Sequence, residues 1–143
     1  MLGTSTRARR ATKRLDATGM LAGCPPEELD RIAEVSRVVS VPAGRILCEQ
    51  GRLALDCMLI EAGRADVLVG TRRVASPGPG ETIGEIGVLD RRPRSATVVA
   101  RTDMRVRIIE ATDFDALLRD APVFSRAVLR ELSGRVRSAN HTA

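Results

Sequence analysis

Short runs of β-branched and aliphatic residues fill the chain from Arg37 to about Ile109, and glycine, proline or aspartate interrupts them roughly every 8–12 residues. This pattern of short apolar runs separated by turn residues constrains the fold more than any other feature, because it is typical of an all-β sandwich or barrel. It predicts about eight strands in total. The clearest runs are residues 38–41, 45–48, 58–60, 65–69, 72–75, 95–100 and 105–109.

Helical patterns lie at both ends of this β segment. Pro25 and Pro26 are followed by two glutamates, which predicts a helix that ends near Ser36. Thr112 is a candidate N-cap for a second helix that must end at Pro122. We expect a third helix over residues 123–138, with an apolar stripe made of Phe124, Ala127, Val128, Leu129, Leu132 and Val136. Helices gathered at the chain ends around a block of strands indicate an α+β domain.

The positive charge of the chain is concentrated at its N-terminus. The net charge is +5, and residues 1–14 carry five basic side chains and no acid, so the remaining residues are neutral overall. We therefore expect a basic flexible tail over residues 1–14 and a folded domain over residues 15–143. Phe114 and Phe124 are the only aromatics, which excludes an aromatic platform for single-stranded nucleic acid. We expect no nucleic-acid binding by this chain alone.

Residue types that carry catalysis or bind metals are scarce. Cys24, Cys48 and Cys57 show no paired spacing, and His141 is the single histidine, so we expect no catalytic residues and no metal site. The sequence also lacks a run of about 18 apolar residues that could span a membrane. These features predict a cytoplasmic protein that is not an enzyme.

The segment from Thr82 to Thr97 breaks the strand pattern and contains two charged residues in apolar surroundings. Gly84 and Gly87 bracket Glu85, and Arg94 precedes a valine-rich run. Burial of these two charges is costly unless each has a partner. A cyclic nucleotide provides both partners, since its phosphate can pair with the Arg94 guanidinium and its ribose 2′-hydroxyl can donate to Glu85. A short helical turn from residue 85 to residue 89 would also direct N–H groups at the phosphate.

The run Gly84-Glu85-Ile86-Gly87-Val88-Leu89, followed by Pro93-Arg94-Ser95-Ala96-Thr97-Val98, resembles the phosphate-binding cassette of the cyclic-nucleotide-binding domain family. The resemblance extends over about residues 15–138 and implies an eight-stranded antiparallel β-roll, jelly-roll-like, with one N-terminal and two C-terminal helices. It further implies a set of ligand contacts: the backbone of Gly84, Ile86 and Ala96, Glu85 on the ribose, Arg94 and Ser95 on the phosphate, Val67 and Ala75 beside the base, and Arg135 of the last helix over it.

The resemblance implies a module in which nucleotide binding repositions the last helix and thereby acts on a protein effector that the sequence does not identify. We expect cyclic AMP rather than cyclic GMP as the ligand, and no further cofactor. Two alternatives stay open. One is an interaction module that forms a homodimer through its C-terminal helix and has a vestigial nucleotide site. The other is the regulatory domain of a larger channel, transporter or enzyme, although Met1 favours an independent sensor.

Overall fold

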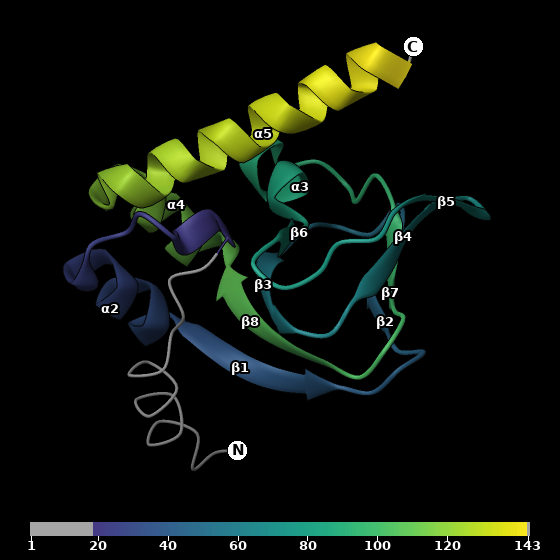
Figure 1. The fold of residues 1–143 in the computed structure, drawn as a ribbon, viewed down its shortest axis with the longest axis horizontal. Helices are drawn as coiled ribbons and strands as arrows, with labels where there is room; N and C mark the ends of the chain where they lie inside the picture. The colour runs from purple at the N-terminus through teal and green to yellow at the C-terminus, as the bar shows by residue number, and fades with distance from the viewer. Residues whose placement is uncertain (1–18, 143) are drawn as a thin grey trace.

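The computed structural model describes residues 19–142, with the side chains of residues 85–86 and 138–142 outside that description. The expectation for the basic tail at residues 1–14 lies outside the described residues. Figure 1 shows the elements, which in chain order are η1 (Gly19–Leu21), α2 (Pro26–Glu34), β1 (Ser36–Val41), β2 (Ile46–Cys48), β3 (Asp56–Ala62), β4 (Ala65–Val69), β5 (Arg72–Ala75), β6 (Thr82–Ile83), α3 (Glu85–Asp90), β7 (Thr97–Ala100), β8 (Met104–Glu110), α4 (Ala111–Asp120) and α5 (Pro122–Thr142).

The strands form two four-stranded antiparallel sheets, ordered β1-β8-β3-β6 and β2-β7-β4-β5. This arrangement confirms the predicted eight-stranded β-roll with one N-terminal helix and two C-terminal helices. Tight turns at Gly63 and Gly70 connect the strands, and both glycines have positive φ. A side chain at Gly63 would collide with the backbone of Asp103, so this turn requires glycine. In the register of β4 and β5, Val67 lies opposite Ala75.

Two helix boundaries differ from the sequence expectation. Helix α2 ends at Glu34, because Ser36 already pairs with Ile109 as the first residue of β1. Thr112 is not an N-cap, because α4 begins directly after β8 and Glu110 occupies the cap position. The Ala111 N–H donates to the Leu55 carbonyl at 2.9 Å, which satisfies one donor of the first turn without a side-chain cap.

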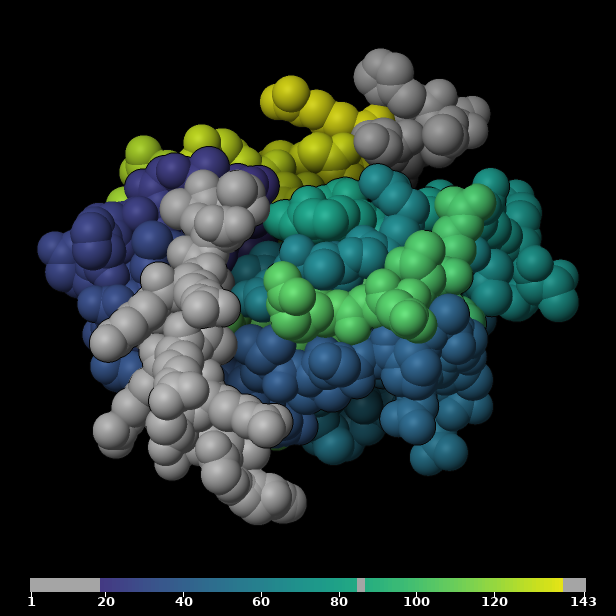
Figure 2. Space-filling model, turned by 60° about the horizontal axis from the view of Figure 1, so that its bottom comes forward, coloured from purple at the N-terminus to yellow at the C-terminus, as the bar shows by residue number. Residues whose placement is uncertain are grey.

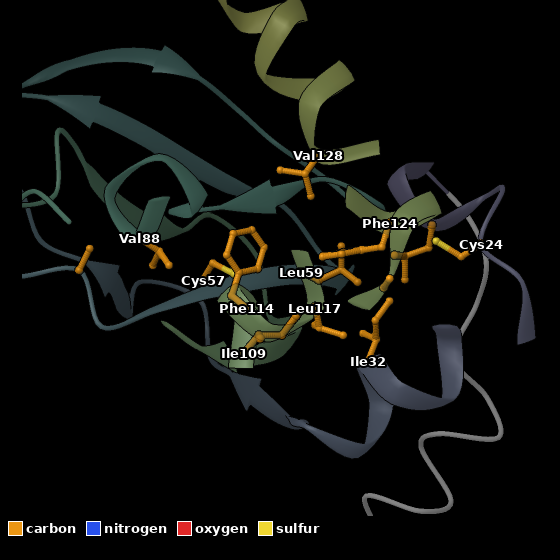
Figure 3. Packing of buried hydrophobic residues seen from close by; sticks show 13 residues of the cluster. Cys24, Ile32, Cys57, Leu59, Val88, Ile109, Phe114, Leu117, Phe124 and Val128 are labelled. Atoms are coloured by element: carbon orange, nitrogen blue, oxygen red, sulfur yellow. The ribbon is translucent and has the colours of Figure 1, made fainter. Parts of the chain in front are cut away.

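The hydrophobic core consists of two clusters. One fills the interior of the β-roll with aliphatic residues and methionine, among them Ile60, Ala65 and Val106. The other lies between the sheet and the helices and contains both aromatic rings, Phe114 and Phe124, in edge-to-face contact with centroids 5.9 Å apart. Figure 3 shows how α2, α4 and α5 meet strands β3 and β8 in this second cluster through Ile32, Phe114, Leu117, Phe124, Val128, Cys57, Leu59 and Ile109.

The predicted apolar stripe of α5 divides between the core and the surface. Phe124, Ala127 and Val128 are buried, whereas Leu129 is 62% exposed and Val136 is 59% exposed. Figure 2 shows α5, coloured yellow, along the edge of the strand body. Within the described residues, the structure has no helix whose length and apolar character would let it cross a membrane.

The N-terminal end of α5 is held by a carboxylate from another helix. Glu28 of α2 is 7% exposed, and its two oxygens accept the backbone N–H groups of Val123 at 3.1 Å and Phe124 at 2.8 Å. These N–H groups belong to the first turn of α5, where no partner within the helix is available. Glu28 therefore caps α5 and joins it to α2.

Candidate functional site

A pocket of about 910 Å³ lies between the sheet β2-β7-β4-β5, the segment around α3 and the inner face of α5. Figure 1 shows α5 passing across α3 and the strands of this end of the roll. The volume falls in the range of roughly 300–1,000 Å³ typical of small-molecule sites. Cys48, Val67, Val98 and other apolar residues form its wall, and Arg94 brings a positive charge to it.

The structure brings together seven of the nine residues that the sequence assigned to ligand binding. Gly84, Val67, Ala75, Arg94, Ser95, Ala96 and Arg135 all line the pocket, although they come from different strands, loops and helices. Glu85 and Ile86 are the first two residues of α3, and their side chains lie outside the described part of the chain. The ligand contacts assigned to all nine residues remain predictions.

Gly84 fixes the local geometry at the start of α3. It adopts φ 84°, a left-handed conformation that glycine tolerates and most other residues avoid. A Cβ atom at this position would collide with Nη1 of Arg94. The backbone of Gly84 therefore lies directly against the arginine, and the predicted helical turn follows as α3. At the other end of α3, Arg91 has φ 55° and pairs with Asp115 of α4 at 2.8 Å.

The Arg94 side chain is only 8% exposed, and it is held by three hydrogen bonds. Nη1 donates to the Gly84 carbonyl at 3.1 Å, and Nη2 donates to the carbonyl of Asp56 at 2.8 Å and to its Oδ1 at 3.0 Å. A buried guanidinium at the wall of a pocket is well suited to an anionic ligand, because the anion would add countercharge in surroundings of low dielectric.

The carboxylate partner of Arg94 is Asp56, which the sequence analysis did not identify. Asp56 is the first residue of β3, and 38 positions separate it from Arg94. The available signal was a single acid directly before the apolar run Cys57-Met58-Leu59-Ile60, where a partly buried carboxylate requires a partner.

Paired strands form the part of the pocket wall that was predicted to contact the nucleotide base. Val67 and Ala75 face each other across β4 and β5, so they contribute to the same part of the pocket. Ser95 and Ala96 follow Arg94 at the entrance to β7 and line the pocket as well. Ser76 and Pro77 continue this wall from the end of β5, and neither was predicted from the sequence.

Helix α5 contacts the pocket through a polar cluster that the sequence analysis identified only in part. Arg135 donates to the Thr82 carbonyl of β6 at 3.1 Å and lies 3.7 Å from the Glu131 carboxylate. The Thr82 hydroxyl donates to the other Glu131 oxygen at 3.0 Å. Thr82 is 4% exposed, so this cluster joins the middle of α5 to a buried strand. Arg135 is thus engaged with β6 and Glu131, and its side chain is 40% exposed.

The described residues contain no group of three or more histidine, cysteine or acidic side chains that could hold a metal ion. The pocket combines an apolar wall, one end lined by a buried arginine, and a helix across its mouth. Fold and pocket together define a β-roll domain whose pocket is suited to a small anionic ligand.

Comparisons with known proteins identify the family. The family model "Cyclic nucleotide-binding domain" matches residues 38–121. The acetyltransferase Pat of Mycolicibacterium smegmatis is 36% identical over 118 residues, which is 80% of this chain and 35% of that protein. The cyclic AMP receptor protein of Thermus thermophilus is 32% identical over 123 residues, 82% of this chain and 57% of the relative.

The crystal structure of the catabolite activator protein from Thermus thermophilus superposes with a TM-score of 0.78 at 29% identity, covering 87% of this chain and 61% of that one. The chain belongs to the cyclic nucleotide-binding domain family, and it is a regulatory domain of that kind. It spans only 35% and 57% of the length of the two relatives described here.

Proposed function

We propose that this domain binds cyclic AMP as a signal and transmits its presence through α5. The observation that carries the proposal is the buried Arg94 at the wall of a pocket that has the size of a small-molecule site. Cyclic AMP is favoured over cyclic GMP because a relative that aligns with most of the chain is named a cyclic AMP receptor protein. The proposal needs no further cofactor and places the protein in the cytoplasm, where cyclic nucleotides act as signals.

Within the proposed complex, the cyclic phosphate lies against Arg94, whose guanidinium has N–H donors beyond those bonded to Asp56 and Gly84. Ser95 and the Ala96 N–H complete the phosphate contacts, and Glu85 accepts from the ribose 2′-hydroxyl. The backbone of Gly84 and Ile86 forms the floor of this end. Val67 and Ala75 pack against the base, and Arg135 stacks over it after leaving Thr82 and Glu131.

We propose that the domain regulates another protein or another part of a longer chain and does not itself catalyse a reaction. One relative is an acetyltransferase of which this chain matches 35%, so a domain of this family occurs there in an enzyme. The folded unit corresponds to residues 15–143 in this proposal.

Calorimetric titration with cyclic AMP and with cyclic GMP tests the proposed ligand. A ligand that binds only the native state stabilises it by RT ln(1 + [L]/Kd), which is ~2.7 kcal/mol at a hundredfold excess over Kd. We expect cyclic AMP to bind more tightly and to raise the melting temperature by several degrees. If neither nucleotide binds or shifts the melting temperature, the sensing function is wrong.

The role of Glu85 has a separate test that uses cyclic 2′-deoxy-AMP. The wild-type chain should bind this analogue more weakly than cyclic AMP, because the analogue lacks the hydroxyl that donates to the carboxylate. Removing one charge-assisted hydrogen bond costs ~1.5–3 kcal/mol. The Glu85→Ala variant should scarcely distinguish the two ligands. Unchanged discrimination in this variant would show that Glu85 does not hold the sugar.

A second candidate function is a homodimerisation module with a vestigial nucleotide site. It is favoured by Leu129 and Val136, two large apolar side chains of α5 that are 62% and 59% exposed. Sedimentation combined with the nucleotide titration discriminates the two functions: a stable dimer that binds neither nucleotide would support this candidate and exclude the first.

A further inference from the structure

Helix α5 has a second face that points away from the pocket and combines apolar and basic side chains. We call this the outer face, and it consists of Leu129, Leu132, Val136, Arg126, Arg130 and Arg137. All three arginines are exposed, Leu129 and Val136 are more than half exposed, and Leu132 is partly buried against the core. The opposite side of the same helix holds Phe124 and Val128 in the core and Arg135 at the pocket.

Helix geometry places these six residues in two neighbouring stripes. Leu129, Leu132 and Val136 follow the spacing i, i+3, i+7, which aligns their side chains along one side of a helix with ~3.6 residues per turn. The same spacing is that of an apolar seam in paired helices. Arg126, Arg130 and Arg137 follow i, i+4, i+11 and form a basic stripe directly beside it.

The charged residues that α5 itself contributes to the outer face are all basic. Glu131 is the only acidic residue in the sequence of α5, and it faces inward, where it accepts from Thr82 and lies near Arg135. Among the residues of α5, the charged side chains beside the apolar seam are therefore arginines, with Arg126 and Arg130 next to Leu129. This combination favours a partner that offers apolar side chains together with carboxylates.

Charge complementarity separates the candidate partners. A second copy of the chain would bring its own Arg126 and Arg130 to the seam, and like charges across paired helices disfavour association. An anionic membrane would attract the arginines, but helices that insert at a membrane surface usually bear a broad apolar face with aromatic residues, which the outer face lacks.

We propose that the outer face of α5 docks an acidic amphipathic helix, supplied by a partner protein or by a further segment of a longer polypeptide. The leucine-type side chains of that helix pack on Leu129, Leu132 and Val136, and its carboxylates pair with Arg126 and Arg130. Because the inner face of α5 lines the nucleotide pocket, one helix carries both surfaces. The proposal concerns the outer face alone and does not depend on which nucleotide the pocket takes.

A pair of synthetic helical peptides tests this surface on the full chain. Both peptides carry leucine at the a and d positions of the heptad; one has glutamate at e and g, and the other has lysine there. Fluorescence anisotropy of the labelled peptides gives the affinity, with and without cyclic AMP. We expect the glutamate peptide to bind at least about tenfold more tightly than the lysine peptide.

Two variants of the outer face sharpen the result. Leu129→Asp should weaken binding of the glutamate peptide roughly tenfold, whereas Leu53→Asp, at an equally exposed leucine on the loop before β3, should leave it unchanged. The double variant Arg126→Glu/Arg130→Glu should reverse the preference and bind the lysine peptide more tightly. A variant that merely unfolds cannot show such a reversal. The charge-matched control Arg37→Glu/Arg45→Glu changes two exposed arginines of β1 and the following turn.

The alternative occupants give distinguishable outcomes. If the chain forms a dimer that Leu129→Asp dissociates, and the glutamate peptide does not bind, the outer face is a self-association surface and the proposal is wrong. Binding to phosphatidylserine vesicles without binding to the glutamate peptide would also overturn it. Equal effects of the Arg126/Arg130 and Arg37/Arg45 reversals would show that the attraction is non-specific. Failure of cyclic AMP to bind, with peptide recognition intact, would reject the proposed function and leave this proposal standing.

Discussion

The buried guanidinium of Arg94 donates hydrogen bonds to several protein oxygen atoms, which offset the cost of its burial. These acceptors do not occupy all of its N–H donors. Its three hydrogen bonds go to the Gly84 carbonyl, the Asp56 carbonyl and the Asp56 carboxylate. A guanidinium has five N–H donors, so donors remain for a ligand. Asp56 holds the planar guanidinium in one orientation. The Arg94 side chain therefore loses less conformational entropy when a ligand phosphate binds.

Replacement of Arg94 should therefore have a large effect on nucleotide affinity. Arg94→Ala leaves the ligand phosphate in the pocket without its cation, a truncation that typically costs ~2–5 kcal/mol. We expect cyclic AMP to bind roughly 30-fold to several thousand-fold more weakly by calorimetry. The matched control is Arg52→Ala, since the Arg52 side chain lies on the neighbouring loop and is 77% exposed. Equal affinity of Arg94→Ala and wild type would refute the phosphate assignment.

Cys48 provides a chemical probe of the same pocket. All three cysteines are buried, but Cys48 lines the cavity, whereas Cys24 and Cys57 belong to the cluster beneath the helices. Saturating cyclic AMP should slow alkylation of Cys48 by iodoacetamide several-fold more than alkylation of Cys24 and Cys57, as measured by peptide mass spectrometry. Equal slowing of all three would indicate general stabilisation of the fold rather than occupation of the pocket.

At the scale of elements, the contact between α5 and β6 lies at the wall of the pocket. Two hydrogen bonds, from the Thr82 hydroxyl to Glu131 and from Arg135 to the Thr82 carbonyl, join the two elements. The ion pair between Arg135 and Glu131 lies within α5. The ligand proposed here needs Arg135, so binding exchanges a contact with β6 for a contact with the base. In this proposal the ligand then holds helix α5, and the local stability of the helix would follow the occupancy of the pocket.

Hydrogen exchange can measure this coupling. A hydrogen bond contributes about 1 kcal/mol net, so Thr82→Val should speed amide exchange in α5 by up to roughly fivefold without ligand. Thr71→Val, at the exposed turn between β4 and β5, should leave this exchange unchanged. Cyclic AMP should slow exchange over residues 123–138 in the wild-type chain. The same exchange with and without cyclic AMP would count against α5 as the responding element.

Cys24, in the segment between η1 and α2, should make the free energy of unfolding depend on pH. Burial raises the pKa of the Cys24 thiol above its ordinary value of 9.0, and the nearby Glu28 carboxylate raises it further. The thiol contributes stability that is fully present below pH 9.0 and is lost as pH rises through the higher folded value. The free energy of unfolding should therefore fall above pH 9.0, and this fall should be smaller in Cys24→Ala, as measured by urea denaturation. Parallel pH profiles would contradict the assignment. The chain has no tyrosine, which removes one common source of alkaline titration.

Across the whole molecule, sequence patterns predicted the structural features that are determined by residues close together in the chain. Strand runs, turn glycines and the apolar spacing of α5 are local signals, and they predicted a block of about eight strands with helices at the chain ends. The β-roll itself was implied by the family resemblance. Strand β6 has only two residues, too few for any periodicity, and it forms because β3 pairs with it. The pairs Asp56 with Arg94 and Thr82 with Glu131 join positions far apart in the chain, which no local pattern encodes.

The capping of α5 by Glu28 is another such long-range contact, and it should matter for global stability. Glu28→Ala leaves one buried and one partly buried N–H group without an acceptor, and hydrogen bonds to a charged group contribute ~1.5–3 kcal/mol. We expect the free energy of unfolding to fall by about 2–3 kcal/mol in urea denaturation. Glu27→Ala removes an exposed carboxylate one position earlier in the same helix and should have little effect. Similar losses in the two variants would contradict the capping role.

The Glu28 contact also anchors the N-terminal end of α5. The helix has 21 residues and is held at Val123 and Phe124. At ~1.5 Å per residue, Arg135 lies ~18 Å from this pivot and the far end nearly 30 Å from it. A tilt of roughly 10° that moves Arg135 by ~3 Å therefore sweeps the far end through ~5 Å. A tilt of this kind would turn a small displacement at the pocket into a larger one at the far end of α5. Its size would depend on how firmly Glu28, together with the buried Phe124 and Val128, holds the other end.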